Sequence, residues 1–344
     1  MDRGLDFNFV IAPVRLEVVI CTYNRAPMLD RALETLRQQR TSFSVAWSVL
    51  VIDNNCTDDT SAVVERHRRA GLKVAMEREP EQGLTPARRC GVESTTAPWI
   101  AFIDDDCLLD ERWIEEVGQF AREHPDCGAF GGRVVLKWES EPADYVLRFP
   151  WAYASQDHGP EPTPVDCLVG AGMVIRRAAL EECGWMSRQF LADRISGRVV
   201  SGGDVEIALR VGSGHELWYA PTCILDHVIP RSRATFGYLR QITLALGRCK
   251  LFGDSMLWPG SYRRWLAASL VMAGGFACGV TREASLALCG RRRAADVLIT
   301  LSFLSGWIGG MYDLARKDAA ERNAIVGCAV PAPRLPVNTD SPRH

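Results

Sequence analysis

Three adjacent carboxylates, Asp104, Asp105 and Asp106, directly follow the apolar run "WIAFI". Residues two apart in an extended chain share a face, so Asp104 and Asp106 are expected to converge on one point. Neighbouring negative charges repel each other, and a divalent cation would remove that repulsion. Oxygen ligands with open positions suit Mg²⁺ or Mn²⁺ held jointly with a diphosphate. The alternative for this cluster is a solvated turn followed by a helix cap.

Alternating strands and helices must position these acids. Four short apolar runs predict buried strands, and the segments between them have helical periodicity, first with Leu29, Ala32, Leu33 and Leu36 on one face. We expect Thr85 to cap the third of these helices and Asp110 the fourth. Such alternation predicts an α/β fold with a mostly parallel sheet.

Polar segments follow the expected carboxyl ends of these strands: "TYNR", "DNN", "EREPEQ" and "DDD". Ligands of such sheets bind in the crevice beyond the carboxyl ends of the strands. The three carboxylates therefore stand where a ligand belongs, and this position favours a metal site over a solvated turn.

Composition excludes several other classes of protein. The 344 residues are 47% hydrophobic and 24% charged, which is typical of a globular chain. The 40 basic and 42 acidic residues give no strong field for nucleic acid. Twelve cysteines are scattered without zinc spacing, which favours buried thiols in a reducing compartment. The first fourteen residues do not resemble a secretory signal, so we expect a cytoplasmic protein, with the cytoplasmic face of the membrane as the alternative.

Five motifs in order resemble those of the family 2 glycosyltransferases, which have the GT-A fold: "VVICTYNRA", "VLVIDNNCTDDT", "GLTPARRCGV", "IAFIDDDCLLDERW" and "GGDVEIALR". The resemblance covers roughly residues 15–235. "DNN" replaces the commoner Asp-Asp, and Arg89 replaces an Asn, which affects the expected donor preference. The QxxRW signature of processive synthases is absent from the sequence, which favours a single addition.

The resemblance implies a nucleotide-sugar donor, with uracil as the expected base, and an inverting transfer to an acceptor hydroxyl. Position by position, it implies that the nucleoside pocket is lined by Thr22, Tyr23, Asn24 and Arg25 and that Asp53 contacts the base. Arg88 would contact the diphosphate. Asp104 and Asp106 would hold the ribose and the metal, with Asp105 as alternate ligand. Asp204 would be the general base. Glu206 is the rival base, because Gly203 replaces the usual Glu.

The chemistry of such a transfer requires two separate groups. An acceptor hydroxyl is a poor nucleophile without a base, and the departing diphosphate needs a cation to stabilise its charge. Asp204 and the three-Asp cluster would supply one each. The alternative role of Asp204 is an N-cap of the helix that begins at "VEIALR".

Further residues have weaker assignments. His227, expected to follow a strand and to precede Arg231 and Arg233, would contact diphosphate or metal, or else be an ordinary loop histidine. Trp151, Tyr153 and Trp185 would stack on sugars or belong to the core. The small-residue segment 170–174 would border the donor sugar or serve close packing.

The carboxy-terminal part, residues 236–330, reads as a helical extension. Two uncharged runs, Trp265–Thr281 and Val297–Tyr312, are separated by Arg291, Arg292 and Arg293. They predict buried core helices, an interfacial hairpin with basic anchors, or membrane spans. Peripheral membrane contact through residues 259–312 would favour a lipid-linked over a soluble glycan acceptor. The tail, residues 331–344, is expected to be disordered.

Two rival functions remain. A sugar-nucleotide nucleotidyltransferase has a similar sheet and metal site, but "CTYNRAPM" lacks the glycine-rich phosphate loop that it needs. An inactive sugar-nucleotide-binding or membrane-scaffold module would not need both the acid cluster and Asp204.

Overall fold

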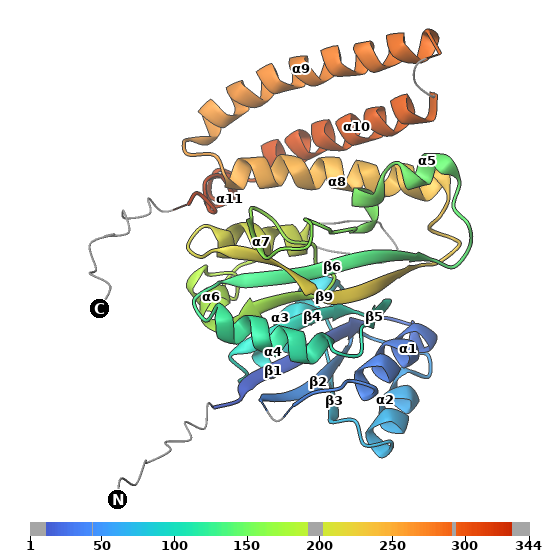
Figure 1. Cartoon of the computed structure of the whole chain (residues 1–344). Coiled ribbons are helices and arrows are strands. Elements are labelled where there is room, and N and C mark those ends of the chain that lie inside the picture. Colours follow the sequence, from blue (N-terminus) through green and yellow to red (C-terminus); the bar gives the residue numbers. More distant parts are fainter. Residues whose placement is uncertain (1–11, 43, 192–201, 291–293, 332–344) are drawn as a thin grey trace, which may run out of the picture.

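The structure is a computed structural model that describes residues 12–42, 44–191, 202–290 and 294–331, and it places a layer of helices against a mixed sheet (Figure 1). The predicted tail lies outside the described residues apart from Pro331, as do the three arginines 291–293. The described strands join into one nine-stranded sheet in the order β3-β2-β1-β4-β8-β6-β9-β5, with β7 paired to β9.

The first half of the sheet is parallel, as the sequence predicts. Its strands are β1 (Val14–Thr22), β2 (Val45–Asp53), β3 (Val74–Arg78) and β4 (Trp99–Asp104). The crossover helices are α1 (Ala26–Arg37), α2 (Thr60–Arg69) and α3 (Leu84–Glu93). In this register Thr22 lies beside Asp53, and Cys21 beside Asp104. The strand ends therefore bring the predicted polar residues to one edge.

The second half of the sheet mixes parallel and antiparallel pairs, so the sheet is mixed but still mostly parallel by paired residues. β8 (Met173–Arg176) is antiparallel to both β4 and β6 (Ala129–Trp138), and β9 (Leu217–Ile229) is parallel to β6. The short strands β5 (Cys107–Leu109) and β7 (Thr163–Val165) are antiparallel to β9. These strands pair across long sequence separations, without the strand–helix–strand alternation that predicts parallel pairing.

Three predicted helix caps differ from the structure. Gly83, with φ of 145°, precedes α3, and its N–H is held by Asn54 Oδ1 at 2.8 Å. Thr85 is buried inside the first turn and donates to the Leu191 carbonyl instead. Asp110 accepts from the Arg112 N–H at 3.0 Å, just before α4 (Trp113–Glu123). The N-cap of α7 (Gly203–Gly212) is Gly202, so the capping role considered for Asp204 is wrong.

Apolar side chains cover both faces of the sheet. One core cluster contains Val18, Ile20 and Trp113, and the other contains Ile100 and Trp185. Trp185 has no exposed surface, so it belongs to the core and does not stack on a sugar.

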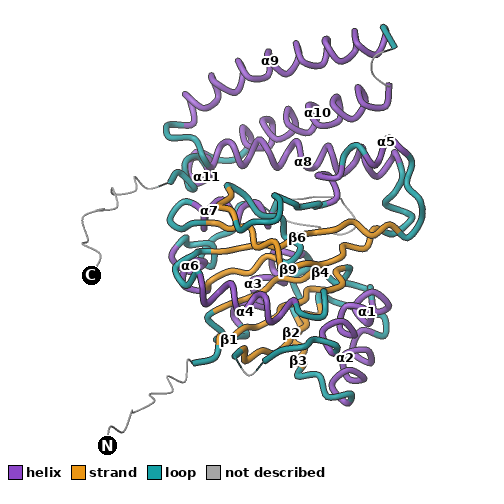
Figure 2. Tube along the Cα trace, viewed as in Figure 1, coloured by secondary structure: helices purple, strands orange, loops and turns teal. Residues whose placement is uncertain are grey.

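The remaining helices lie between the strands or form the outer layer. They are α5 (Asp144–Leu147), the 3-10 turn η1 (Pro150–Tyr153), α6 (Arg177–Glu182), α8 (Phe236–Met256), α9 (Tyr262–Leu288), α10 (Ala294–Arg316) and α11 (Ala319–Ile325). Figures 1 and 2 show α8, α10 and α9 stacked in that order away from the sheet. By length and composition α9 and α10 are able to cross a membrane.

The two long outer helices differ in packing. α10 fits closely against α8, because glycines at the contact leave room for backbone: a Cβ added to Gly306 would lie 1.8 Å from the Leu244 carbonyl oxygen. By contrast α9 exposes Leu270 and Val271, at 60% and 78%. The buried-core prediction is therefore wrong for α9.

The α8–α10 contact gives a stability prediction with an internal control. We expect Gly306→Ala to lower the free energy of unfolding by about 1–3 kcal/mol, because the methyl group must push two backbones apart. Gly279→Ala on α9, where a Cβ meets nothing within 4 Å, should raise it by about 0.5–1 kcal/mol through helix propensity. Denaturant titrations of both variants measure this, and equal stability of Gly306→Ala and the parent would contradict the packing.

Candidate active site

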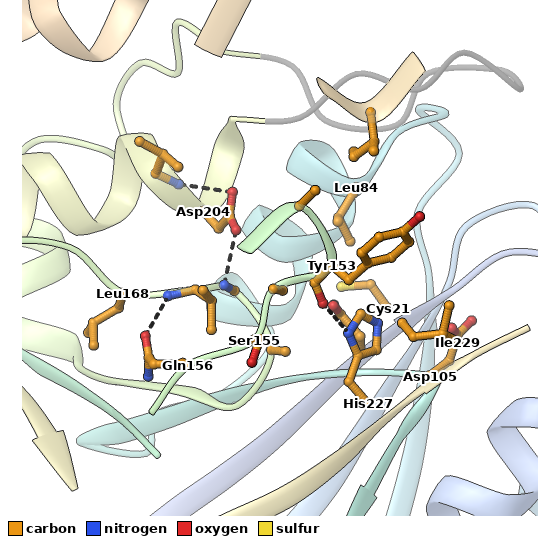
Figure 3. A pocket seen from close by; sticks show the side chains of 18 of the residues that line it. Cys21, Leu84, Asp105, Tyr153, Ser155, Gln156, Leu168, Asp204, His227 and Ile229 are labelled. Atoms are coloured by element: carbon orange, nitrogen blue, oxygen red, sulfur yellow. Dashed lines mark hydrogen bonds between the residues drawn. The ribbon is translucent and has the colours of Figure 1, made fainter. Parts of the chain in front are cut away.

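A cavity of about 710 Å³ opens at the edge where β1 and β4 end (Figure 3). It is lined by the β1–α1 loop, the segments 151–158 and 167–171, the start of α7, the end of β9 and one side of α8. The parallel half of the sheet, the loop segments and the helical layer thus all contribute to one site.

The β1–α1 loop binds the acid cluster directly. The Thr22 hydroxyl donates to Asp105 Oδ2 at 2.9 Å, and Arg25 forms ion pairs with both Asp105 and Asp106. Both carboxylates are buried. Burial raises the pKa of Asp105 to about 6, although Arg25 opposes this shift.

Asp106 is the most heavily neutralised of the three acids. Arg233 donates to its Oδ2 at 3.0 Å, and His227 Nε2 lies 3.5 Å from its Oδ1. Burial opposes ionisation, but the neighbouring His227, Arg25 and Arg233 charges outweigh it and hold the pKa of Asp106 well below its usual range. The same pairing raises the pKa of His227 despite its burial.

His227 lies inside β9, not after a strand as predicted, because β9 continues to Ile229. Its Nδ1–H donates to the Tyr153 carbonyl at 2.9 Å, which fixes the orientation of the ring. Among the described residues, neither His227 Nε2 nor Asp106 Oδ1 has a hydrogen-bond partner. The two atoms face each other 3.5 Å apart as an ion pair with no further partner in the described part of the chain, and a divalent cation would be able to take the place of the ring proton between them.

The donor set around this position fits a hard divalent cation. Ligand atoms of Asp104, Asp106 and Cys107 all lie within 4.8 Å of one another. The carboxylates suit Mn²⁺ or Mg²⁺, and an imidazole beside them favours a transition metal such as Mn²⁺ over Mg²⁺. Burial raises the pKa of the Cys107 thiol well above its usual range, so it stays protonated, whereas metals bind thiolates. The sequence did not point to Cys107, and its chemistry gives it no ligand role.

Asp204 and Arg88 lie on another wall of the cavity. Asp204 Oδ2 accepts from the Gly170 N–H at 3.0 Å, and its Oδ1 accepts from the Val205 N–H at 2.9 Å (Figure 3). Arg88 is almost completely buried, with Nη2 3.7 Å from Asp104 Oδ1. A Cβ on Gly170 would lie 2.9 Å from both Arg88 Nη2 and Asp204 Oδ2. The glycine therefore allows the carboxylate and the guanidinium to approach each other.

Glu206 lies elsewhere. Its side chain is fully buried and is not part of the cavity wall. It accepts from the Phe190 and Leu191 N–H groups and from Arg210 Nη1 at 2.9 Å. Burial raises the pKa of Glu206 despite these partners. The structure thus gives it the geometry of a buried ion pair that anchors the segment before α7.

Two residues predicted for the nucleoside pocket do not line the cavity. Asn24 Oδ1 accepts from the Thr57 N–H at 2.7 Å, and Asp53 Oδ1 accepts from the Cys56 N–H at 2.6 Å. The first bond holds the loop beyond β2 against the loop beyond β1, and the second closes the turn at the end of β2. Tyr23, 47% exposed, does line the cavity.

Sequence reasoning missed several wall residues because they lie in irregular segments or on the outer layer. Buried Gln156 bridges the Gly132 carbonyl and the Val169 N–H. Arg233 was noted in sequence but not assigned to the acids that it binds. Tyr238, Ile242 and Leu246 of α8 also line the cavity. Their four-residue spacing was a visible signal, but only the fold shows what that face meets.

Comparison with known proteins shows the family to which this chain belongs. Residues 17–184 match the family model described as Glycosyl transferase family 2. Glycosyltransferase AglE of Haloferax volcanii is 31% identical over 266 residues, which cover 76% of this chain and 81% of that protein. The chain belongs to glycosyltransferase family 2.

Other similarities are partial or concern the fold. A validoxylamine A glucosyltransferase of Streptomyces hygroscopicus subsp. jinggangensis is 36% identical over 103 residues, or 30% of this chain, which spans only 24% of that protein. The solved mannosyltransferase PcManGT from Pyrobaculum calidifontis, in complex with GDP-Man and Mn²⁺, superposes with a TM-score of 0.57 at 17% identity, covering 88% of each chain. The predicted GT-A fold with a carboxy-terminal helical region is confirmed.

The buried position of Glu206 gives a prediction about the stability of the protein. We expect Glu206→Gln to lower the free energy of unfolding by about 3 kcal/mol, because Arg210 loses its buried partner. Glu181→Gln, which removes an exposed partner of Arg177, should change it by less than about 1 kcal/mol. Thermal unfolding measures both, and a stable Glu206→Gln variant would contradict the structural role.

Proposed function

We propose that this glycosyltransferase moves a hexosyl group from a UDP-linked donor to an acceptor hydroxyl with inversion, in the assembly of a cell-surface glycan or polysaccharide. The observation that carries this proposal is that Asp204 and two members of the acid cluster, Asp104 and Asp105, line one cavity from separate elements, with Asp106 buried directly behind them. A single displacement at the sugar carbon needs such an arrangement, because the base and the leaving group act on opposite sides of the ring.

The proposed metal ligands are Asp104, Asp106 and His227. The unbonded Oδ1 of Asp106 and Nε2 of His227 support this assignment. Bound Mg²⁺ or Mn²⁺ would stabilise the charge that develops on the departing diphosphate. Arg25 and Arg233 already balance the charge of Asp105 and Asp106, and buried Arg88 offers a further positive group on the wall that carries Asp204, 3.7 Å from Asp104. Thr22 and Tyr23 line the part of the cavity that is proposed to bind the donor. Asn24 and Asp53 do not line it, but their hydrogen bonds fix the loops that surround it.

Asp204 is the proposed general base. The Gly170 and Val205 N–H groups orient its carboxylate in the first turn of α7. Asp204 then takes the proton of the acceptor hydroxyl as that oxygen attacks the sugar. Glu206 is unsuited to this step because its oxygens are occupied away from the cavity.

A peripheral membrane contact through α9 and α10 is part of the proposal. α9 exposes Leu270, Val271 and Met272, and exposed Arg263 and Arg282 lie near the ends of this apolar stretch. An apolar face with basic residues beside it is the composition of an interfacial helix. This composition supports a contact between α9 and a membrane surface.

The role of Asp204 is tested by replacement with Asn. We expect Asp204→Asn to lower kcat by about 100- to 10,000-fold, since the acceptor proton loses its base, with little change in donor affinity. Asp126→Asn, a change at an exposed carboxylate remote from the cavity, serves as the matched control. An Asp204→Asn enzyme with parental kcat would refute the assignment.

The metal site is tested by titrating Mn²⁺ in the presence of UDP and following free Mn²⁺ by electron paramagnetic resonance. Asp106→Asn and His227→Gln should each weaken Mn²⁺ binding by about tenfold or more. His215→Gln, which removes a histidine paired with Glu182 outside the cavity wall, should leave it unchanged. Equal Mn²⁺ affinity in all four proteins would rule out these ligands.

Membrane contact is tested by cosedimentation with anionic phospholipid vesicles. The double variant Leu270→Asp/Val271→Asp should bind vesicles at least tenfold more weakly, because two exposed apolar contacts become charged. Thr41→Asp/Ser61→Asp adds the same charge at exposed positions of the sheet domain and should bind like the parent. Identical binding of both double variants would contradict a contact through α9.

A further inference from the structure

One face of α8 is half-buried and apolar. Tyr238, Ile242 and Leu246 are spaced four residues apart, so they lie on the same side of the helix. All three are half-buried and line the active-site cavity. Another side of this helix packs against α10, where Gly247 approaches the Phe303 carbonyl.

The apolar wall extends beyond the helix. Trp151, Tyr153 and Ile229 line the same cavity, and the rings of Tyr153 and Tyr238 are stacked with centroids 6.1 Å apart. Trp151 remains 48% exposed. Apolar surface around a cavity stays hydrated at a free-energy cost until a ligand with apolar groups covers it. This side of the cavity is thus suited to hydrocarbon.

The apolar wall begins directly at the acid cluster. The Arg233 guanidinium, which donates to Asp106 at 3.0 Å, lies over the Tyr238 ring at 5.9 Å. A ligand along α8 therefore has its polar end next to the proposed metal ligands and Asp204. A nucleotide-sugar donor has no hydrocarbon chain, so the chain must belong to the acceptor.

The wall also connects to the outer helices. Trp151 makes an edge-on contact with Phe303 of α10, with ring centroids 6.3 Å apart. The same helix exposes Leu301 and Ile308, at 38% and 51%. Apolar groups thus continue from the cavity to the surface of the helical layer.

We propose that the acceptor is amphipathic and that its hydrocarbon chain lies along the α8 face formed by Tyr238, Ile242 and Leu246. This inference rests on the proposed transferase function and specifies the substrate class that its site accepts. The hydroxyl that receives the sugar lies at Asp204, and the chain leads from there toward the outer helices.

The experiment compares two probes with the same head group, methyl β-D-glucopyranoside and n-octyl β-D-glucopyranoside below its micelle concentration. Calorimetry measures their binding to the full chain in the presence of UDP and Mn²⁺. The octyl probe should bind at least about tenfold more tightly, with one site per chain, because several methylene groups leave water. Leu246→Gln and Ile242→Asn should each reduce this ratio to about threefold or less.

Leu244→Gln is the matched control, because Leu244 is 40% exposed on the same helix but does not line the cavity. It should keep the parental ratio. Equal binding of the two probes to the parent would overturn the proposal. A preference for the octyl probe that survives Leu246→Gln but disappears in Leu270→Asp/Val271→Asp would also overturn it, since the chain would then bind α9.

Donor hydrolysis separates this inference from the proposed function. UDP release from UDP-glucose and the other donors of a UDP-sugar panel, without acceptor, is measured on the parent and reports the donor half of the reaction. UDP release by the parent, together with loss of the octyl preference in Leu246→Gln but not in Leu244→Gln, supports the α8 site. An octyl preference unaffected by the α8 variants, alongside normal release, removes the α8 site and leaves the transferase intact. Absence of release from every donor in the parent would instead count against the proposed UDP-sugar transfer.

Discussion

The site depends on keeping carboxylates charged inside the protein. Buried acids are tolerated only when cations or hydrogen-bond donors surround them. Here the partners come from distant parts of the chain: Arg25 from the loop after β1, His227 from β9 and Arg233 from the segment before α8. The same charge balance that permits three adjacent aspartates therefore ties the ends of β1 and β4 to β9 and to the segment before α8.

Small residues determine how closely the reactive groups approach. Gly170 gives Asp204 a backbone donor and leaves room for Arg88, while Gly247 and Gly306 allow α8 and α10 to approach closely. Close helix packing orients α8 so that one of its faces looks into the cavity. The outer layer therefore contributes to the site through α8. It gives one side of the cavity an apolar character that the sheet edge lacks.

Local sequence signals predicted the parallel strands and the edge at which the acids gather, because both depend on periodicity and turn chemistry within short segments. They failed where distant segments decide the outcome. The antiparallel pairing of β8 with β4 has no local signature, and the cap expected at Thr85 was displaced by the Asn54–Gly83 bond. Asp204 and Glu206 are two apart in a helix, so they face different sides, and the fold shows that Asp204 lines the cavity whereas Glu206 is buried. His227 lines the cavity and faces Asp106, but its place inside β9 depends on sheet pairing, which has no local signal.

The most direct test of the central claim is the identity of the phosphate product released from a panel of sugar nucleotides, with and without Mn²⁺. If the acid cluster holds the donor diphosphate and Asp204 activates the acceptor, the enzyme releases nucleoside diphosphate in a cation-dependent manner, and the transferred sugar has inverted anomeric configuration. Release of pyrophosphate, retention of configuration, or turnover that is the same in the presence of a chelator would contradict the account.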